Sequence, residues 1–215
     1  MSSVPSGAAV FLLGDVFDFY FEYASVVPKR FFDVLRAIHA CVRRGVEVHF
    51  LAGNHDYWFG SFLRDDVGVT PHGGDVFVEC QGRRLWCTHG DLFVPGDPSY
   101  RPIRAIIRNR FVVSAAKVLH PDLLTAIADR VSDGSKKRNR RSVEAMARKL
   151  AARPSADFFS RGNDALIMGH IHYPLHERKD GKDLVIVGDW ITQFTFARLR
   201  EGKITLETFR REATG

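Results

Sequence analysis

The chain has 215 residues, of which 45% are hydrophobic and 26% charged, and its formal net charge is +6. This is the composition of a soluble globular domain with an inserted segment, and no apolar run reaches the ~18 residues of a membrane span. Residues 1–7 lack the features of a signal peptide, and three scattered cysteines favour a reduced, cytoplasmic protein.

The positive charge is concentrated in one segment. Residues 101–161 contain 15 Lys and Arg against five Asp and Glu, so the rest of the chain is mildly acidic. Such a segment favours an anionic partner, which could be nucleic acid, anionic lipid or a phosphorylated substrate. The alternative is that it forms a solvated helical face.

In the first third of the chain the pattern predicts a strand, a helix and a second strand. A buried strand is expected over 8–13, where four apolar residues are followed by Gly-Asp. An amphipathic helix is expected to start at Pro28 and to end at Gly45. The next strand covers 46–51, and this order predicts a parallel pair with a right-handed connection.

Later segments predict a hairpin, a helical insertion and further strands. Two short apolar runs flank Gln81-Gly82, which is typical of a hairpin. Residues 98–162 have helical periodicity, with interruptions near His120-Pro121 and Asp133-Gly134. We therefore predict a core formed by residues 1–97 and 163–215 and a basic helical cap formed by 98–162. Further strands are expected at 165–168, 184–187, 194–199 and 204–209, separated by Asp180-Gly181 and Glu201-Gly202 turns.

Four apolar runs end in residues that bind divalent cations. The endings are Gly14-Asp15, Gly53-Asn54-His55-Asp56, Thr88-His89-Gly90-Asp91 and Gly169-His170-Ile171-His172. Taken singly, Gly-Asn is a standard turn pair, and a His-x-His pair more often packs in a core. If His170 and His172 lie on a strand, they share one face, so both imidazoles can enter one cavity. The combined candidate ligands are Asp15, Asn54, His89, His170 and His172.

Mixed oxygen and imidazole donors suit Mn²⁺, Fe²⁺ or Zn²⁺, and the absence of cysteine argues against a structural zinc site. Two such ions that share a carboxylate, roughly 3.5–4 Å apart, would clamp an attacking hydroxide and a phosphoryl oxygen. The pattern therefore indicates a binuclear hydrolase, for which Mn²⁺ is the expected ion.

The ordered motifs resemble those of the calcineurin-like metallophosphoesterases. This resemblance implies an α/β fold, an αββα sandwich of mixed sheets with a helical cap insertion. It also implies that Asp15 bridges two metals, that Asn54, His89 and His170 complete one site, and that His172 belongs to the other. His55, oriented by Asp56, would contact the scissile phosphate and protonate the leaving group.

Within this superfamily the chain most resembles the UDP-2,3-diacylglucosamine diphosphatases of lipid A synthesis. The resemblance rests on the 12–22 segment Leu-Leu-Gly-Asp-Val-Phe-Asp-Phe-Tyr-Phe-Glu, on the basic helical insertion and on the later Val-Gly-Asp-Trp. It implies hydrolysis of the pyrophosphate of a UDP-linked diacylated sugar to UMP and 2,3-diacylglucosamine 1-phosphate. The subfamily often has Arg where His55 stands, which leaves the role of position 55 open. The implied substrate contacts are Asn54, His55, Asp97, Ser135, Asn139 and His170.

The same resemblance implies a location on the cytoplasmic side of the inner membrane, with peripheral attachment to its anionic surface. Cations would bind the phosphates, and apolar residues of the cap would receive the acyl chains. The alternative is that these apolar residues only pack the cap helices against one another.

One element of the family pattern is missing from the sequence. The family begins with a strand ending in Asp-x-His, which completes the first metal site, and residues 1–7 contain neither Asp nor His. The metal site to which His172 belongs is therefore incomplete in this chain. We expect a truncated start rather than a degenerate protein, because the downstream motifs are intact.

Two other functions fit parts of the pattern. A phosphodiesterase or phosphatase acting on nucleotides or nucleic acid would use the basic segment to hold a polyanion. Few aromatic residues are interleaved with the basic ones, which disfavours nucleic acid as the partner. A binding module that keeps the fold with a single metal would show no turnover even with excess Mn²⁺.

Overall fold

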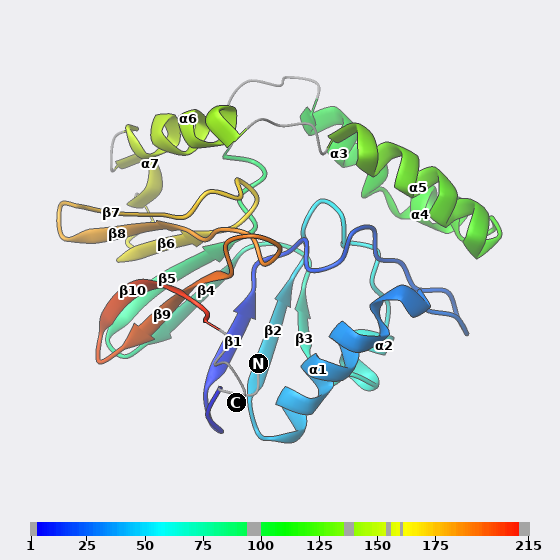
Figure 1. The fold of residues 1–215 in the computed structure, drawn as a ribbon, viewed down its shortest axis with the longest axis horizontal. Coiled ribbons are helices and arrows are strands. Elements are labelled where there is room, and N and C mark those ends of the chain that lie inside the picture. The colour runs from blue at the N-terminus through cyan, green and yellow to red at the C-terminus, as the bar shows by residue number, and fades with distance from the viewer. Residues whose placement is uncertain (1–3, 94–99, 136–139, 154–155, 160, 211–215) are drawn as a thin grey trace. The chain divides into compact units, whose positions relative to one another are not determined.

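The computed structural model describes residues 4–93, 100–135, 140–153, 156–159 and 161–210 (Figure 1). The chain forms two compact units. Unit 1 contains residues 1–74 and 96–137, and unit 2 contains residues 75–95 and 138–215. The segment predicted as a single cap thus contributes to both units, and the core-and-cap division stays a prediction.

Unit 1 contains a parallel three-stranded sheet in the order β1-β2-β3. Strand β1 pairs with β2 so that Ala9 lies opposite Glu47, which confirms the predicted parallel pair. The sequence did not indicate β3, because three residues that include Pro71 are too few to show a period. The elements are β1 (Ala9–Leu12), the 3₁₀ turn η1 (Lys29–Phe31), α1 (Phe32–Arg43), β2 (Glu47–Leu51), α2 (Phe62–Asp65), β3 (Thr70–His72), α3 (Tyr100–Ile107), α4 (Arg110–Ala116) and α5 (Pro121–Ser135).

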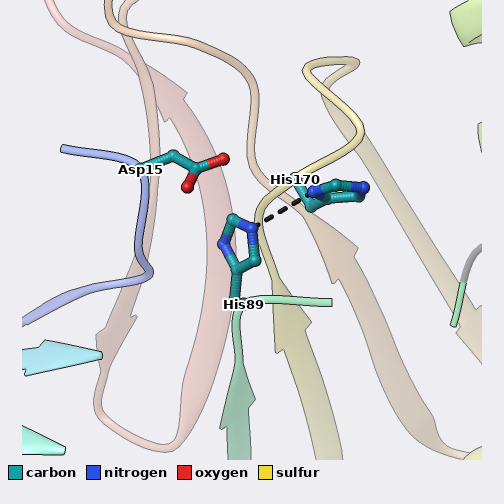
Figure 2. Close-up of side chains that lie close together, drawn as sticks. All are labelled: Asp15, His89 and His170. Atoms are coloured by element: carbon teal, nitrogen blue, oxygen red, sulfur yellow. Dashed lines mark hydrogen bonds between the residues drawn. The ribbon is translucent and has the colours of Figure 1, made fainter. Parts of the chain in front are cut away.

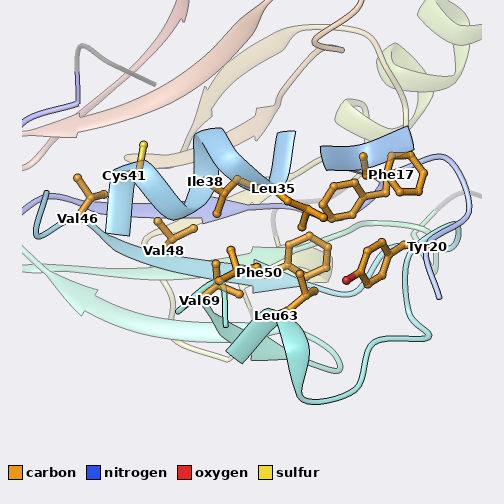
Figure 3. Close-up of a cluster of buried hydrophobic side chains, with 12 residues drawn as sticks. Phe17, Tyr20, Leu35, Ile38, Cys41, Val46, Val48, Phe50, Leu63 and Val69 are labelled. Carbon is orange, nitrogen blue, oxygen red and sulfur yellow. The ribbon is translucent and has the colours of Figure 1, made fainter. Parts of the chain in front are cut away.

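The core of unit 1 lies between α1 and the sheet (Figure 3). Leu35, Ile38 and Cys41 recur at three-residue spacing along α1 and are buried against Val48 and Phe50 of β2. Burial of each large apolar side chain contributes about 1.5–3 kcal/mol. This packing fixes the ends of β1 and β2, and Asp15 and Asn54 each lie in the turn that follows one of these strands.

Helices α3 to α5 of unit 1 are joined to the segment after β1. Leu124 of α5 is buried with Phe21 and Trp58, and the Tyr23 hydroxyl donates to the Leu119 carbonyl at 2.7 Å. The predicted helical character is confirmed, including the break before Pro121. Helix α5 runs through Asp133-Gly134 to Ser135, so the helix is not interrupted at Asp133-Gly134 itself.

Unit 2 contains a mixed five-stranded sheet in the order β4-β5-β6-β8-β7 and a separate β9–β10 hairpin. Strands β5, β6 and β8 are parallel, while β4 and β7 pair antiparallel at the edges. The predicted hairpin is confirmed, since Gln81 and Gly82 both have positive φ between β4 and β5. The elements are β4 (Val76–Cys80), β5 (Arg83–Thr88), α6 (Arg140–Ala151), α7 (Ala156–Phe159), β6 (Ala165–Met168), β7 (Leu175–Lys179), β8 (Lys182–Ile186), β9 (Thr195–Arg200) and β10 (Lys203–Thr208).

Helices α6 and α7 supply the apolar cover of this sheet. Leu150 and Phe158 are fully buried against Leu166, Met168 and Leu184. The central strands are buried on both faces, which is why β6 was predicted with its correct bounds from a continuous apolar run. Within the described residues, no helix has the length and hydropathy to cross a membrane.

Candidate active site

In unit 1 the Asp15 turn and the Gly53 turn are joined by a buried carboxylate. Asp56 is fully buried, and its two oxygens accept four backbone N–H groups: those of Asp15 at 3.0 Å, Val16 at 2.7 Å, Phe17 at 3.2 Å and Gly53 at 2.9 Å. Each of these N–H groups would otherwise be a buried donor without a partner. Asp56 therefore sets the backbone from which Asp15 projects.

A further hydrogen bond joins the same two turns, with Asp15 as the acceptor. The backbone N–H of His55 donates to Asp15 Oδ1 at 2.9 Å, while Gly14 and Asp15 both have positive φ. A Cβ at Gly53 would lie less than 3.0 Å from Asp15 Oδ1, Asp15 N and Asp56 Oδ1. Glycine is required at position 53 because the Asp15 backbone occupies the space of a side chain.

The His55 imidazole lies near the Asp18 carboxylate, and its orientation by Asp56 stays a prediction. His55 Nδ1 lies 3.4 Å from Asp18 Oδ1, and both side chains are partly exposed. The Asp56 carboxylate accepts backbone N–H groups of Asp15, Val16 and Gly53. Asp18 lies within the 12–22 segment on which the family resemblance rests.

The electrostatics of unit 1 reflect the burial of Asp56. Burial first, and then the negative charge of Asp15, raise the pKa of Asp56 to about 6, against the lowering effect of the backbone N–H groups. Two carboxylates this close favour a compensating positive charge. A divalent cation on Asp15 would provide it.

Helix α3 is followed by a residue that contacts the same turn. Arg108 Nη2 donates to the Gly53 carbonyl at 2.6 Å, and its guanidinium lies 5.1 Å from the centre of the Tyr57 ring. Sequence reasoning missed Arg108 as a support of the Asn54 turn, because the contact joins residues 55 positions apart. Asn54 itself is half-buried directly after Gly53.

In unit 2 two of the predicted ligands face each other. His89 follows β5 and is buried, and His170 follows the neighbouring parallel strand β6. Figure 2 shows their imidazoles turned toward one another, with His170 Nδ1 and His89 Nε2 3.1 Å apart. Two nitrogens that bind one ion at about 2.0–2.1 Å are separated by this distance at an angle of about 100°. The pair therefore fits adjacent ligands of a divalent cation.

The expectation that His170 and His172 share a strand face is wrong. Strand β6 ends at Met168, and both histidines lie in the turn that follows, with φ of +61° and +56°. Their directions come from left-handed backbone rather than from strand alternation. His172 is exposed, whereas Ile171 between them is buried in the core of unit 2.

The five predicted metal ligands are divided between the units. Asp15 and Asn54 belong to unit 1, and His89, His170 and His172 belong to unit 2. Asp15, His89 and His170 each offer a ligand atom suited to a metal ion. The predicted substrate contacts Asp97 and Asn139 lie outside the described residues, and Ser135 is described only as the last backbone position of α5.

Comparison with known proteins gives a consistent result. The profile described as Calcineurin-like phosphoesterase matches residues 3–174. A curated relative named UDP-2,3-diacylglucosamine hydrolase, from Porphyromonas gingivalis, is 30% identical over 88% of this chain and 79% of its own. Relatives of the same name from Xanthomonas oryzae pv. oryzae and Aeromonas hydrophila are each 28% identical, over 97% and 94% of this chain and 88% and 86% of their own.

Among solved structures, the phosphopantetheinyl hydrolase of Mycobacterium tuberculosis is 20% identical with a TM-score of 0.40, over 86% of this chain and 80% of its own. The profile match includes all four ligand-bearing turns. The expected fold, with mixed sheets and helices, and the expected enzyme class are confirmed. The chain therefore belongs to the calcineurin-like phosphoesterase family, a family of metal-dependent phosphoester hydrolases.

Proposed function

We propose that this protein hydrolyses the pyrophosphate of UDP-2,3-diacylglucosamine, a step of lipid A synthesis. Water adds to one phosphorus, the bond to the bridging oxygen breaks, and that oxygen leaves on the second phosphate. The products are UMP and 2,3-diacylglucosamine 1-phosphate. Two observations support this proposal. The chain belongs to the phosphoesterase family, and it covers 79% and 88% of the length of two relatives named UDP-2,3-diacylglucosamine hydrolase.

The observation that carries the metal dependence is the 3.1 Å approach of the His89 and His170 nitrogens. If the ions are bound, Asn54, His89 and His170 would hold one of them, His172 would contribute to the other, and Asp15 would be shared by both. Bound Mn²⁺, Fe²⁺ or Zn²⁺ would act as a Lewis acid on a phosphoryl oxygen and on the attacking water.

His55 is the protein's own group at the reacting phosphate in this proposal. Its Nδ1 lies beside the Asp18 carboxylate, so Nε2 is the nitrogen directed to a substrate oxygen. A hydrogen bond from Nε2 would stabilise the charge that develops on the phosphoryl group. A phosphate is a good leaving group, so this stabilisation matters more than proton donation.

Helices α3 to α5 and the residues between them have the character needed for an acylated substrate. Leu124 and Val113 pack inward, whereas Ile106, Phe111 and Val118 are 59%, 70% and 86% exposed. These apolar side chains alternate with exposed basic residues, a combination that favours an anionic lipid surface. We therefore propose that the protein attaches peripherally to an anionic membrane through this surface, on the cytoplasmic side of the inner membrane as the proposed substrate of lipid A synthesis suggests.

The activity is tested with the full chain, stripped of metal by a chelator and reloaded with Mn²⁺, Fe²⁺ or Zn²⁺. We expect UMP release from UDP-2,3-diacylglucosamine only after reloading, and much slower turnover of a UDP-sugar without acyl chains. His89→Ala should abolish the activity, whereas His39→Ala, an exposed histidine of α1, should not change it. Equal turnover of both UDP-sugars, or preferred cleavage of simple phosphodiesters or nucleic acid, would contradict the proposed substrate.

Membrane attachment is tested by sedimentation with vesicles. We expect binding to vesicles rich in phosphatidylglycerol, weakened by salt, and little binding to pure phosphatidylcholine. The double variant Phe111→Ser and Val118→Ser should reduce binding. A matched change, Phe32→Ser on α1, removes a phenylalanine that is 65% exposed and should not. Equal loss in both variants would contradict the assigned surface.

A further inference from the structure

The turn that carries His172 has a backbone that histidine does not favour. His170 and His172 both have φ near +60°, the left-handed region in which a Cβ is crowded by the carbonyl. Two such residues within three positions persist only where neighbouring groups hold them. For His170, the adjacent N–H of Gly169 is bound by the His89 carbonyl at 3.1 Å.

For His172, a side chain from the segment between β8 and β9 makes the contact. Gln193 Nε2 donates to the His172 carbonyl at 3.3 Å. The same amide accepts the backbone N–H of Asp189 through Oε1 at 3.1 Å. One planar amide therefore connects two turns of unit 2 and uses its donor and its acceptor on opposite sides.

The turn that supplies Gln193 is itself rigid. The Asp189 carboxylate accepts the backbone N–H groups of Ile191 at 2.8 Å and Gln193 at 3.3 Å. Trp190 stacks on Phe209 with ring centres 5.8 Å apart, and its indole N–H donates to the Thr195 carbonyl at 3.0 Å. These hydrogen bonds and the ring contact therefore hold the backbone of Gln193 in place.

Gly188 provides the space in which the amide lies. A Cβ at this position would be less than 3.0 Å from Gln193 Oε1 and from Thr195 Oγ1. The backbone N–H of Gly188 donates to Thr195 Oγ1 at 2.9 Å, so the residues after β8 are in contact with both Gln193 and Thr195. Glycine at position 188 therefore leaves room for the Gln193 side chain.

We propose that Gln193 is a positioning residue for His172: its N–H group holds the His172 carbonyl and so keeps the left-handed backbone on which the direction of the imidazole depends. The role rests on the proposed function, in which His172 is a metal ligand. Groups that orient metal ligands commonly change metal affinity by about 10–100-fold when they are removed. We assign Gln193 an effect of that size.

Two substitutions separate the donor from the acceptor. Gln193→Met removes both hydrogen bonds at similar length, and Gln193→Glu keeps an oxygen for Asp189 but loses the donor to His172. We expect both variants to weaken, by about tenfold or more, the metal-binding step that His172→Ala removes, as measured by calorimetry with Mn²⁺ on the metal-free full chain. Gln81→Met is the matched control, because Gln81 also accepts a turn N–H, that of Gly202 at 3.1 Å.

A second readout does not depend on metal. In the NMR spectrum of the metal-free protein, the His172 Cα chemical shift should leave its left-handed value in both Gln193 variants and in Gly188→Ala, and stay unchanged in Gln81→Met. Wild-type metal affinity in Gln193→Glu together with a loss in Gln193→Met would overturn the proposal, because the amide would then act only on Asp189. An unmoved Cα shift would overturn it as well.

The two proposals fail in different ways. If His172→Ala leaves metal binding unchanged, the ligand role of His172 in the proposed function is wrong. The Cα shift in the Gln193 variants still decides whether Gln193 holds the turn.

Discussion

The turn that carries Asp15 in unit 1 and the turn that carries His170 and His172 in unit 2 are held by different means. In unit 1 a single buried carboxylate, Asp56, collects four backbone N–H groups from two segments. In unit 2 the histidines lie in left-handed backbone, where the His89 carbonyl binds the Gly169 N–H and the Gln193 amide binds the His172 carbonyl. One buried group thus sets the first turn, whereas the second is held by separate hydrogen bonds from two segments.

The buried carboxylates of the two units differ in the same way. Asp183 of β8 is bound by Arg83 at 2.7 Å and by His176 at 2.8 Å, so its charge is paired. Asp56 is bound by backbone N–H groups and stands near the like charge of Asp15. The comparison indicates that unit 1 keeps an unfavourable electrostatic arrangement at the place where a cation would relieve it.

The largest effect is expected from Asp56→Ala. Four buried N–H groups would lose their acceptor, so we expect a loss of about 3–5 kcal/mol in the free energy of unfolding, measured with urea. Asp66→Ala changes an exposed aspartate of the same unit and should cost less than about 0.5 kcal/mol. A loss below about 1 kcal/mol for Asp56→Ala would show that Asp56 does not organise the turn.

Gly53→Ala tests the close approach of the two segments in unit 1. The added Cβ would push the Asp15 backbone away, which we expect to cost about 1–3 kcal/mol and to reduce hydrolysis about 100-fold. Gly73→Ala is the control, because a Cβ there meets nothing within 4 Å. Equal activity of the two variants in the UMP-release assay would contradict the crowding argument.

Asp183→Asn tests the paired carboxylate of unit 2 through pH. Burial opposes ionisation, but the hydrogen bonds from His176 and Arg83 outweigh it and hold the pKa of Asp183 below its ordinary value. The folded state then binds fewer protons than the unfolded state, so this stabilisation is present above about pH 4 and is lost as the pH falls through the folded pKa.

The Asp183→Asn variant should therefore lose about 1–2 kcal/mol at neutral pH, and less as the solution is acidified. Urea unfolding at a series of pH values measures both quantities. Asp33→Asn, at an exposed position of α1, serves as the reference. A constant difference between Asp183→Asn and the wild type at every pH would contradict the assigned charge pairing.

The smallest effect compares His172→Gly with His172→Ala. Both variants remove the imidazole, but only glycine adopts φ of +56° without strain, so His172→Gly should be more stable by about 1 kcal/mol. Thermal unfolding of the two metal-free variants measures the difference. Equal stability would indicate that the left-handed backbone at His172 stores no strain.

Much of the molecule could be predicted from local pattern. The four strand ends with their metal-binding residues, the helix between Pro28 and Gly45, and the turns at Gln81-Gly82, Asp180-Gly181 and Glu201-Gly202 follow from burial and from the conformational freedom of glycine. The short edge strands β3 and β7 could not be predicted in this way. Strand β3 has only three residues, and four of the five residues of β7 are polar.

The sequence by itself determined the family, the fold class and the chemical type of the candidate ligands, since these depend on residue types at strand ends. The tertiary structure alone decided which groups support them. The Asp18 carboxylate lies near His55 Nδ1, Arg108 contacts the Gly53 carbonyl, and Gln193 contacts His172. The physical reason is that a hydrogen bond between distant segments depends on where folding brings their backbone groups, and residue order carries no local sign of it.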